Sequence, residues 1–268
     1  MEIAHIDEIK NEVGNGCTEP IFCSLHDGRD VIFKSYNNPE GRKILVNELI
    51  CLRLAQKLNL PVPDGGLARI DDTSSVSCLL SNTQDLRGVG FYSVRLNNVT
   101  PGLYDMPREF IQKYCVNSQD FIPIILFDHL VYNNDRNNGN ALFDFKSKKL
   151  YIIDNSHCFY LGSIWDSIQL ERCITEEDFR HNKILANNKY FYNNLVGICD
   201  LDRNILYEKA NLFKSLIKDD FLDEIFCEIP TEWGIGTNDL ETLKKYIKYR
   251  LNSLIQMCDV ICNDWEVI

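Results

Sequence analysis

Two apolar stretches flank a polar stretch in the middle of the chain, and this pattern predicts where the chemistry lies. FIPIILFDHLVY (121–132) is predicted to be a helix. ALFDF (141–145) and LYIID (150–154) predict two short strands joined by a basic turn. Three polar residues consequently fall on loops at the ends of these elements: Asp135, Asn140 and Asp154.

The spacing of these three residues is typical of a phosphoryl-transfer site. Asn140 stands five positions after Asp135, and Asp154 ends the second strand. In protein kinases an Asp accepts the proton of the substrate hydroxyl, an Asn five positions later holds a metal ion, and a hairpin supplies a metal-binding Asp. The alternative is an ordinary polar loop, because Asp and Asn also favour turns.

The N-terminal third begins with a glycine-containing loop, VGNGCTEP (13–20), followed by a predicted hairpin formed by IFCSL and DVIFKSY. Gly14 and Gly16 permit positive φ, so their N–H groups are suited to surrounding phosphate oxygens. A Gly-x-Gly sequence by itself fits a flexible entry turn equally well.

Lys34 interrupts the second strand of this hairpin on the face that it shares with Ile32 and Tyr36, and a lysine on an apolar face needs a partner. The next segment (41–60) has the apolar spacing of an amphipathic helix that ends before Pro61, and Glu48 stands within it. A Lys34–Glu48 ion pair would direct the amine at nucleotide phosphates. Alternatively, Glu48 is solvated and Lys34 reaches to the edge of the sheet.

Further strands are predicted in SSVSCLLSN (74–82) and GFYSVRLNN (90–98), whereas LPVPDGGLARIDD (60–72) is interpreted as a turn. These segments predict an α+β, two-lobed protein-kinase-like fold. Residues 1–98 would form a small nucleotide-binding lobe with an antiparallel sheet and one helix, and residues 99–268 a larger, mainly helical catalytic lobe. The boundary lies near Asn98, and we expect the backbone of Leu96 to contact the adenine edge.

The remainder of the chain is predicted to be mainly helical. The stretch after Asp154 carries three hydroxyl residues of a lid or activation segment, Ser163, Ser167 and Thr175, none within a specific phosphorylation motif. Downstream, amphipathic segments predict packed helices, and DLETLKKYIKYRLNSLIQMCDVI (239–261) is expected to be one final helix.

Composition excludes several classes of protein. The 268 residues include 45% hydrophobic and 25% charged residues, as in a soluble globular protein, and a formal net charge of −11 argues against nucleic acid or an anionic membrane as the main partner. The eleven cysteines form no Cys-x-x-Cys pair, and Cys258 and Cys262 on one helical face are expected to pack rather than bind metal. No signal peptide or membrane span is predicted, so we expect a cytoplasmic protein.

Taken together, these segments resemble the HipA-like kinases in their short, stand-alone form. The resemblance extends over GNGCTEP, VIFKSYNNPEG, LVNELICLRLAQKLNLPVP, GFYSVRL, NNDRNNGNALFD, IIDNSHCF and the late IPTEW with its final helix. It implies an enzyme of the bacterial cytosol that uses ATP and Mg²⁺ to phosphorylate Ser or Thr of a protein. The family includes toxins paired with an antitoxin, which makes an antitoxin-type partner an expectation as well.

The resemblance also implies a role for each matched residue. Asp135 would be the catalytic base, and Lys34, held by Glu48, would anchor phosphates that Gly14, Gly16 and Thr18 also contact. The metal ligands would be Asn140 and Asp154, and Asp128 and His129 would brace the loop or simply pack beneath it.

Two departures from better-known kinases keep other classes open: Asn134 precedes Asp135 in place of Arg, and Asn155-Ser156 follows Asp154 in place of Phe-Gly. A nucleotide-binding pseudokinase is one alternative, and a lipid or small-molecule kinase is another.

Overall fold

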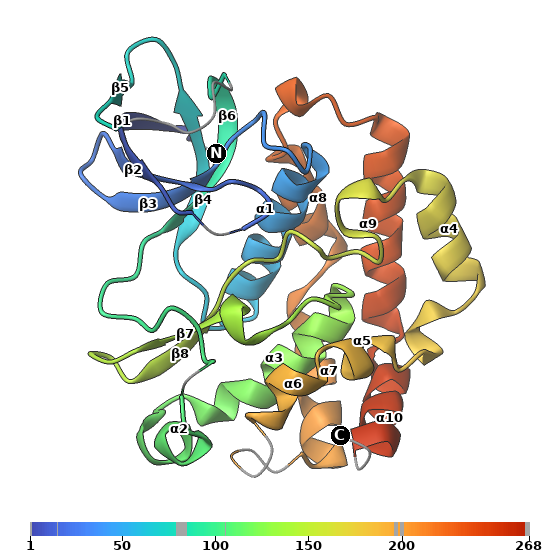
Figure 1. The fold of residues 1–268 in the computed structure, drawn as a ribbon. Helices are drawn as coiled ribbons and strands as arrows, with labels where there is room; N and C mark the ends of the chain where they lie inside the picture. The colour runs from blue at the N-terminus through green and yellow to red at the C-terminus, as the bar shows by residue number, and fades with distance from the viewer. Residues whose placement is uncertain are drawn as a thin grey trace.

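The computed structural model describes residues 2–14, 16–78, 85–104, 106–195, 198 and 201–265. Its α+β architecture combines a β-sheet formed by the N-terminal third with helices that follow it in the chain (Figure 1). A second sheet has two strands. Within the described residues, no helix is both long and apolar enough to cross a membrane.

The large sheet has the strand order β2-β3-β6-β4-β1-β5, and β1 also pairs with β2. This extra pairing closes five of the strands on themselves around a small apolar core that includes Ile6, Val31 and Phe33, all 0% exposed. Most pairs are antiparallel, whereas β1 runs parallel to β4 and β5. The strands are β1 (Ala4–Glu12), β2 (Ile21–Leu25), β3 (Asp30–Lys34), β4 (Gly65–Ile70), β5 (Ser75–Val76) and β6 (Gly88–Val94).

Helix α1 (Lys43–Lys57) joins the sheet to the rest of the molecule. Its apolar residues are buried on several sides, because it contacts β4 and β6 as well as the later elements η3 (Gly162–Ile164) and α8 (Asp219–Cys227). Figure 1 shows α1 between the sheet and the C-terminal helices. A single apolar core therefore includes Leu49 of α1, Phe91 of β6 and Ile125 of the helical part.

The helical part also includes the hairpin of β7 (Ala141–Asp144) and β8 (Lys149–Ile152), which projects at one edge of the molecule (Figure 1). Its α-helices are α2 (Arg108–Tyr114), α3 (Phe121–Leu130), α4 (Ser167–Thr175), α5 (Lys183–Asn187), α6 (Lys189–Asn193), α7 (Arg203–Leu216), α8 (Asp219–Cys227), α9 (Thr237–Asn252) and α10 (Leu254–Trp265). Its 3₁₀ turns are η1 (Ser118–Asp120), η2 (Asn138–Asn140), η3 (Gly162–Ile164), η4 (Asp178–Arg180) and η5 (Thr231–Trp233).

The IPTEW segment attaches the helical part to the sheet at η5. The carboxylate of Glu232 accepts a hydrogen bond of 2.8 Å from the Val89 N–H, and the Trp233 indole donates one of 2.8 Å to the Val89 carbonyl. The backbone of Val89 in β6 is thus satisfied by a segment more than a hundred residues later in the chain.

Two strands, β1 and β4, are not predicted by the hydrophobic pattern. No strand is predicted before the glycine loop, where the structure has β1, because irregular register with β2 between Ile6 and Glu8 and between Ile9 and Asn11 breaks the alternation that identifies a strand. The segment 60–72, interpreted as a turn, contains β4, which begins with Gly65-Gly66. A Cβ at Gly65 would lie 2.4 Å from the Tyr92 carbonyl oxygen, so glycine here permits close approach of two strands.

Two further expectations are corrected. The strand predicted over 74–82 is reduced to the two residues of β5, Ser75–Val76, and residues 79–82 lie outside the described part of the chain. The single helix predicted over 239–261 is two helices, α9 and α10, separated at Ser253. By contrast, the predicted helix before the polar loop and the β7–β8 hairpin are confirmed.

Candidate active site

Lys34, Glu48 and Asp154 meet where β3, α1 and the segment after β8 come together. The ammonium group of Lys34 pairs with the Glu48 carboxylate and lies 2.9 Å from Oδ1 of Asp154. It also donates a 2.8 Å hydrogen bond to the hydroxyl of Ser156, which in turn donates to Glu48 at 2.9 Å. The predicted Lys34–Glu48 pair is therefore present, and Lys34 does not reach to solvent at the sheet edge.

These charges shift one another's protonation equilibria. Burial by itself would lower the pKa of Lys34, but the negative charges of Asp154 and Glu48 outweigh it and raise that pKa above its ordinary value. Burial would raise the pKa of Asp154, but the neighbouring Lys34 charge and hydrogen bond lower it below its ordinary value. Both groups are consequently charged at neutral pH.

The loop that carries Asp135 and Asn140 is braced from below by Arg136, which is fully buried. The Arg136 guanidinium forms an ion pair of 3.0 Å with Asp128 at the end of α3 and donates to the Ile153 carbonyl at 2.7 Å and to Asn155 at 2.9 Å. Of the two roles left open for Asp128, bracing the loop or simple packing, the ion pair with Arg136 supports bracing. His129 is also buried, and its Nδ1 lies 2.8 Å from the Ile125 carbonyl within α3.

Asn140 and Asp154 present oxygen atoms that fit a hard divalent cation. The Asn140 amide nitrogen donates to the Asp135 carbonyl at 2.7 Å, and its side-chain oxygen accepts no hydrogen bond from the residues that the structure describes. The Asn140 carbonyl accepts from the Ile153 N–H at 3.0 Å and so places this loop beside Asp154. Mg²⁺ is typically held by one or two protein ligands together with substrate phosphates, so this donor set suits it.

The glycine loop lies at the same end of the sheet as Lys34. Ile21 pairs with Phe33, so the loop that precedes Ile21 ends beside the residue that follows Phe33, which is Lys34. Gly14 and Gly16 have φ of +77° and +108°, and both are exposed. These angles suit glycine, and Thr18 is buried at the base of the loop.

Leu96 follows the end of β6 and is half-buried. Lys34 pairs with Phe91 in the middle of β6, the strand beside β3. Leu96 comes after Val94, the last residue of β6, so it lies beyond the C-terminal end of that strand. Of the three hydroxyl residues of the expected lid segment, Ser163 lies in η3, and Ser167 and Thr175 lie at the two ends of α4. Cys258 packs in the apolar core, as expected for a helix-packing thiol.

Several residues that position the site were not singled out from the sequence. Asn47 of α1 donates to the Ser156 carbonyl at 2.6 Å and to the Gly162 carbonyl at 3.0 Å, so it fixes the segment after Asp154. Arg136 and Ser156 were visible only as neighbours of Asp135 and Asp154. Their sole sequence indication is their place inside NNDRNNGN and IIDNSHCF.

A buried lysine with two carboxylates, beside a loop bearing an Asp and an Asn, is the arrangement of a phosphotransferase site. Solved structures with similar folds are kinases. The Helicobacter pylori proinflammatory kinase CtkA is 13% identical with a TM-score of 0.55, and the alignment covers 94% of each chain. The Golgi casein kinase with Mn/ADP bound is 14% identical with a TM-score of 0.50, covering 96% of this chain and 74% of that one.

The sequence profile of the HipA-like kinase family matches residues 6–195, so the chain belongs to the HipA-like kinases. A search of curated proteins found no match. The resemblance inferred from the motifs is thereby confirmed, and the class of enzyme is a kinase-like phosphotransferase.

Proposed function

We propose that this protein is an ATP-dependent Ser/Thr protein kinase that uses Mg²⁺. The observation that carries the proposal is the convergence of Lys34, Glu48 and Asp154, far apart in sequence, beside the loop that exposes Asp135. Lys34 would bind nucleotide phosphates, with Glu48 fixing its direction. Gly14, Gly16 and Thr18 would contact the same phosphates, and Leu96 the adenine edge.

The proposal divides the chain into two lobes near Asn98, with the nucleotide between them. Asn140 and Asp154 would hold Mg²⁺, which when bound neutralises phosphate charge. Asp135, whose side chain is 51% exposed, would face the acceptor. During transfer its carboxylate would accept the proton of the acceptor hydroxyl while the new oxygen–phosphorus bond forms and ADP leaves.

A transfer assay tests the proposal directly. Wild-type protein, Asp135→Ala and the control Asp144→Asn are incubated with γ-labelled ATP, Mg²⁺ and a cell lysate. Asp144 is an acid in the β7–β8 turn region, where it accepts from Lys146 N and Ser147, outside the proposed site. We expect label in Ser or Thr of proteins for wild type and Asp144→Asn, and about 10²-fold to 10⁴-fold less for Asp135→Ala.

Equal label with wild type and Asp135→Ala would contradict the proposal. Label recovered only in lipid or small molecules would identify another acceptor class, and tight ATP binding with no transfer would indicate a pseudokinase. Phosphoproteomics of cells expressing wild type or Asp135→Ala would name the acceptor, and affinity purification from the same cells would test for an antitoxin-type partner.

A further inference from the structure

His157 lies between the carboxylate of Asp135 and that of Glu40, which stands in the loop between β3 and α1. Its Nε2 is 3.1 Å from Oε2 of Glu40, and its Nδ1 is 3.6 Å from Oδ2 of Asp135. The first distance is that of a hydrogen bond, and the second is a close polar contact slightly longer than a hydrogen bond. The side chains of His157 and Glu40 are 36% and 25% exposed, so this link lies at the mouth of the site.

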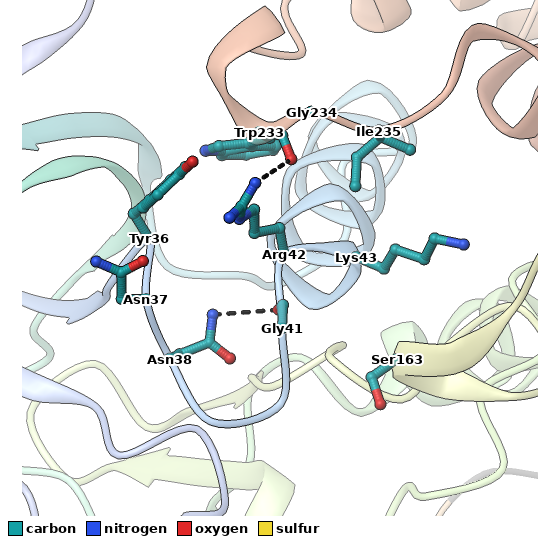
Figure 2. A pocket seen from close by; sticks show the side chains of 10 residues that line it. All are labelled: Tyr36, Asn37, Asn38, Gly41, Arg42, Lys43, Ser163, Trp233, Gly234 and Ile235. Atoms are coloured by element: carbon teal, nitrogen blue, oxygen red, sulfur yellow. Dashed lines mark hydrogen bonds between the residues drawn. The ribbon is translucent and has the colours of Figure 1, made fainter. Parts of the chain in front are cut away.

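Glu40 is held in place by the turn that carries it. The buried Asn38 side chain donates to the Ser35 carbonyl at 2.9 Å and to the Gly41 carbonyl at 3.2 Å, and it accepts from the Glu40 N–H at 3.0 Å. Figure 2 shows the bond from Asn38 to Gly41 across the turn, and the bond from the next residue, Arg42, to the Trp233 carbonyl. The backbone of Glu40 is therefore held in place, so that its side chain can orient a neighbouring side chain.

The His157 ring is confined from the other side by Gly162. At φ +61° this glycine packs so closely that a Cβ there would lie 3.0 Å from Cδ2 of His157. The bonds from Asn47 to the carbonyls of Ser156 and Gly162 hold the two ends of the intervening segment on α1. The ring therefore has little freedom to turn away from Asp135.

Asp135 itself has few constraints on its carboxylate. Within the described part of the chain, its other side-chain contact is between Oδ1 and the Asn137 amide at 3.5 Å, the outer limit of a hydrogen bond. Its backbone is better held, because the carbonyl accepts from Asn140 at 2.7 Å and the N–H donates to Asn133 at 3.0 Å. The direction of the carboxylate thus depends on the imidazole ring beside it.

We propose that His157 is a positioning residue that directs the Asp135 carboxylate toward the acceptor by linking it to Glu40. This inference rests on the proposed function, in which Asp135 accepts the proton of the acceptor hydroxyl. An imidazole can serve two carboxylates at once when both ring nitrogens carry hydrogen. His157 exchanges no proton with the acceptor; it fixes the orientation of the group that does, and a misplacement of about 1 Å there costs roughly 100-fold in rate.

Kinetics with four variants test the role: His157→Ala, His157→Gln, Glu40→Gln, and His157→Ala with Glu40→Gln. We expect His157→Ala to lower kcat about 10-fold to 100-fold with the KM for ATP unchanged. His157→Gln, which keeps a donor, should recover part of the loss. Glu40→Gln should cost less, and the double variant should be no slower than His157→Ala, because Glu40 acts through His157. An unchanged kcat, a rise in KM alone, or additive losses would overturn the role.

The contacts can be measured without turnover. The ¹⁵N shifts of the His157 ring report whether each nitrogen carries hydrogen, and we expect Asp135→Asn and Glu40→Gln each to change them, while the shifts of the exposed His181 stay constant. If neither substitution moves the His157 signals, the inference fails even where transfer is active. If wild type transfers no phosphate to any acceptor, the proposed function fails, and the ring shifts still decide whether His157 links the two acids.

Discussion

Two buried clusters of charged residues lie beside the segment after β8, one around Arg136 and one around Lys34. They differ in how positive and negative charges are balanced. Arg136 pairs with Asp128, and both side chains are 0% exposed. Lys34 faces two carboxylates, Glu48 at 5% exposure and Asp154 at 38%. The first cluster matches one cation with one anion and satisfies its remaining donors on carbonyls and an amide, whereas the second holds surplus negative charge at an opening to solvent.

This difference in charge balance distinguishes a cluster that supports the structure from a cluster that is suited to chemistry. A matched, fully buried pair has no capacity for another ion, so its role is to hold the Asp135 loop against Ile153 and Asn155. Asp154 has φ of +57°, and one of its oxygens already serves Lys34. Under the proposed function, a cation that arrives with a nucleotide would bind this partly exposed carboxylate.

Among the predictions that test this comparison, the largest effect is expected from removing the surplus negative charge. Asp154→Asn should lower the rate of phosphate transfer by about 10³-fold, because an amide replaces the charged ligand at the phosphates. Asn tolerates the left-handed backbone at this position, so the melting temperature should change little. Transfer assays and thermal melts beside the control Asp144→Asn measure both. A rate within tenfold of wild type would show that Asp154 is not needed for chemistry.

Substitutions in the Arg136–Asp128 pair should change the free energy of unfolding. Arg136→Met or Asp128→Leu alone leaves one buried charge unpaired, and each should lower the free energy of unfolding by about 3–5 kcal/mol. The double variant should lose less than the sum, since no uncompensated charge remains. Urea unfolding of the three variants measures this coupling. Additive losses would mean that the pair is not the unit that braces the loop.

The pH dependence of stability that His129 causes tests whether the buried region excludes a further charge. Burial lowers the pKa of His129 from its ordinary value of 6.5 to about 4. The unfolded chain therefore binds a proton between these values that the folded chain does not, so stability falls as pH drops from 6.5 toward 4 and is unaffected above about 7. The loss between pH 7 and pH 5 should be about 2 kcal/mol.

The measurement compares unfolding at pH 7 and pH 5 for wild type and His129→Gln. The variant is expected to be less stable at both pH values, but its own change between them should be smaller than that of wild type. The same pH dependence in both proteins would assign the effect to other groups.

The smallest expected effect concerns competition between Lys34 and a metal for Asp154. In Lys34→Met, Glu48 and Asp154 lose their cation, so Mg²⁺ alone should bind more tightly than to wild type. A gain of about 1 kcal/mol in binding corresponds to a further rise of about 2–4 °C in melting temperature on adding Mg²⁺. Melts with and without Mg²⁺ measure it, and Lys34→Met with Asp154→Asn is the control that should not respond. An equal response in all three would place the metal elsewhere.

Much of the site could be predicted because its residues stand in short, ordered motifs. The hairpin that delivers Asp154 has clear apolar alternation, and Lys34 is conspicuous as a charge within an apolar strand. The contacts that position the site could not be predicted in the same way. Arg136 and Asp128 are eight positions apart across a helix end, and His157 meets Glu40 from a distance of more than a hundred residues, so neither contact follows from local periodicity.

The amino-acid sequence by itself determined the helix that carries Glu48, the hairpin before Asp154, and the membership in a kinase family, because periodicity and motif spacing are local properties. Tertiary structure alone decided that β1 and β4 complete the sheet, that Arg136 is buried beneath the loop, and that His157 stands between two acids. Each of these depends on which distant groups lose water together, and desolvation is a property of the packed molecule rather than of neighbours along the chain.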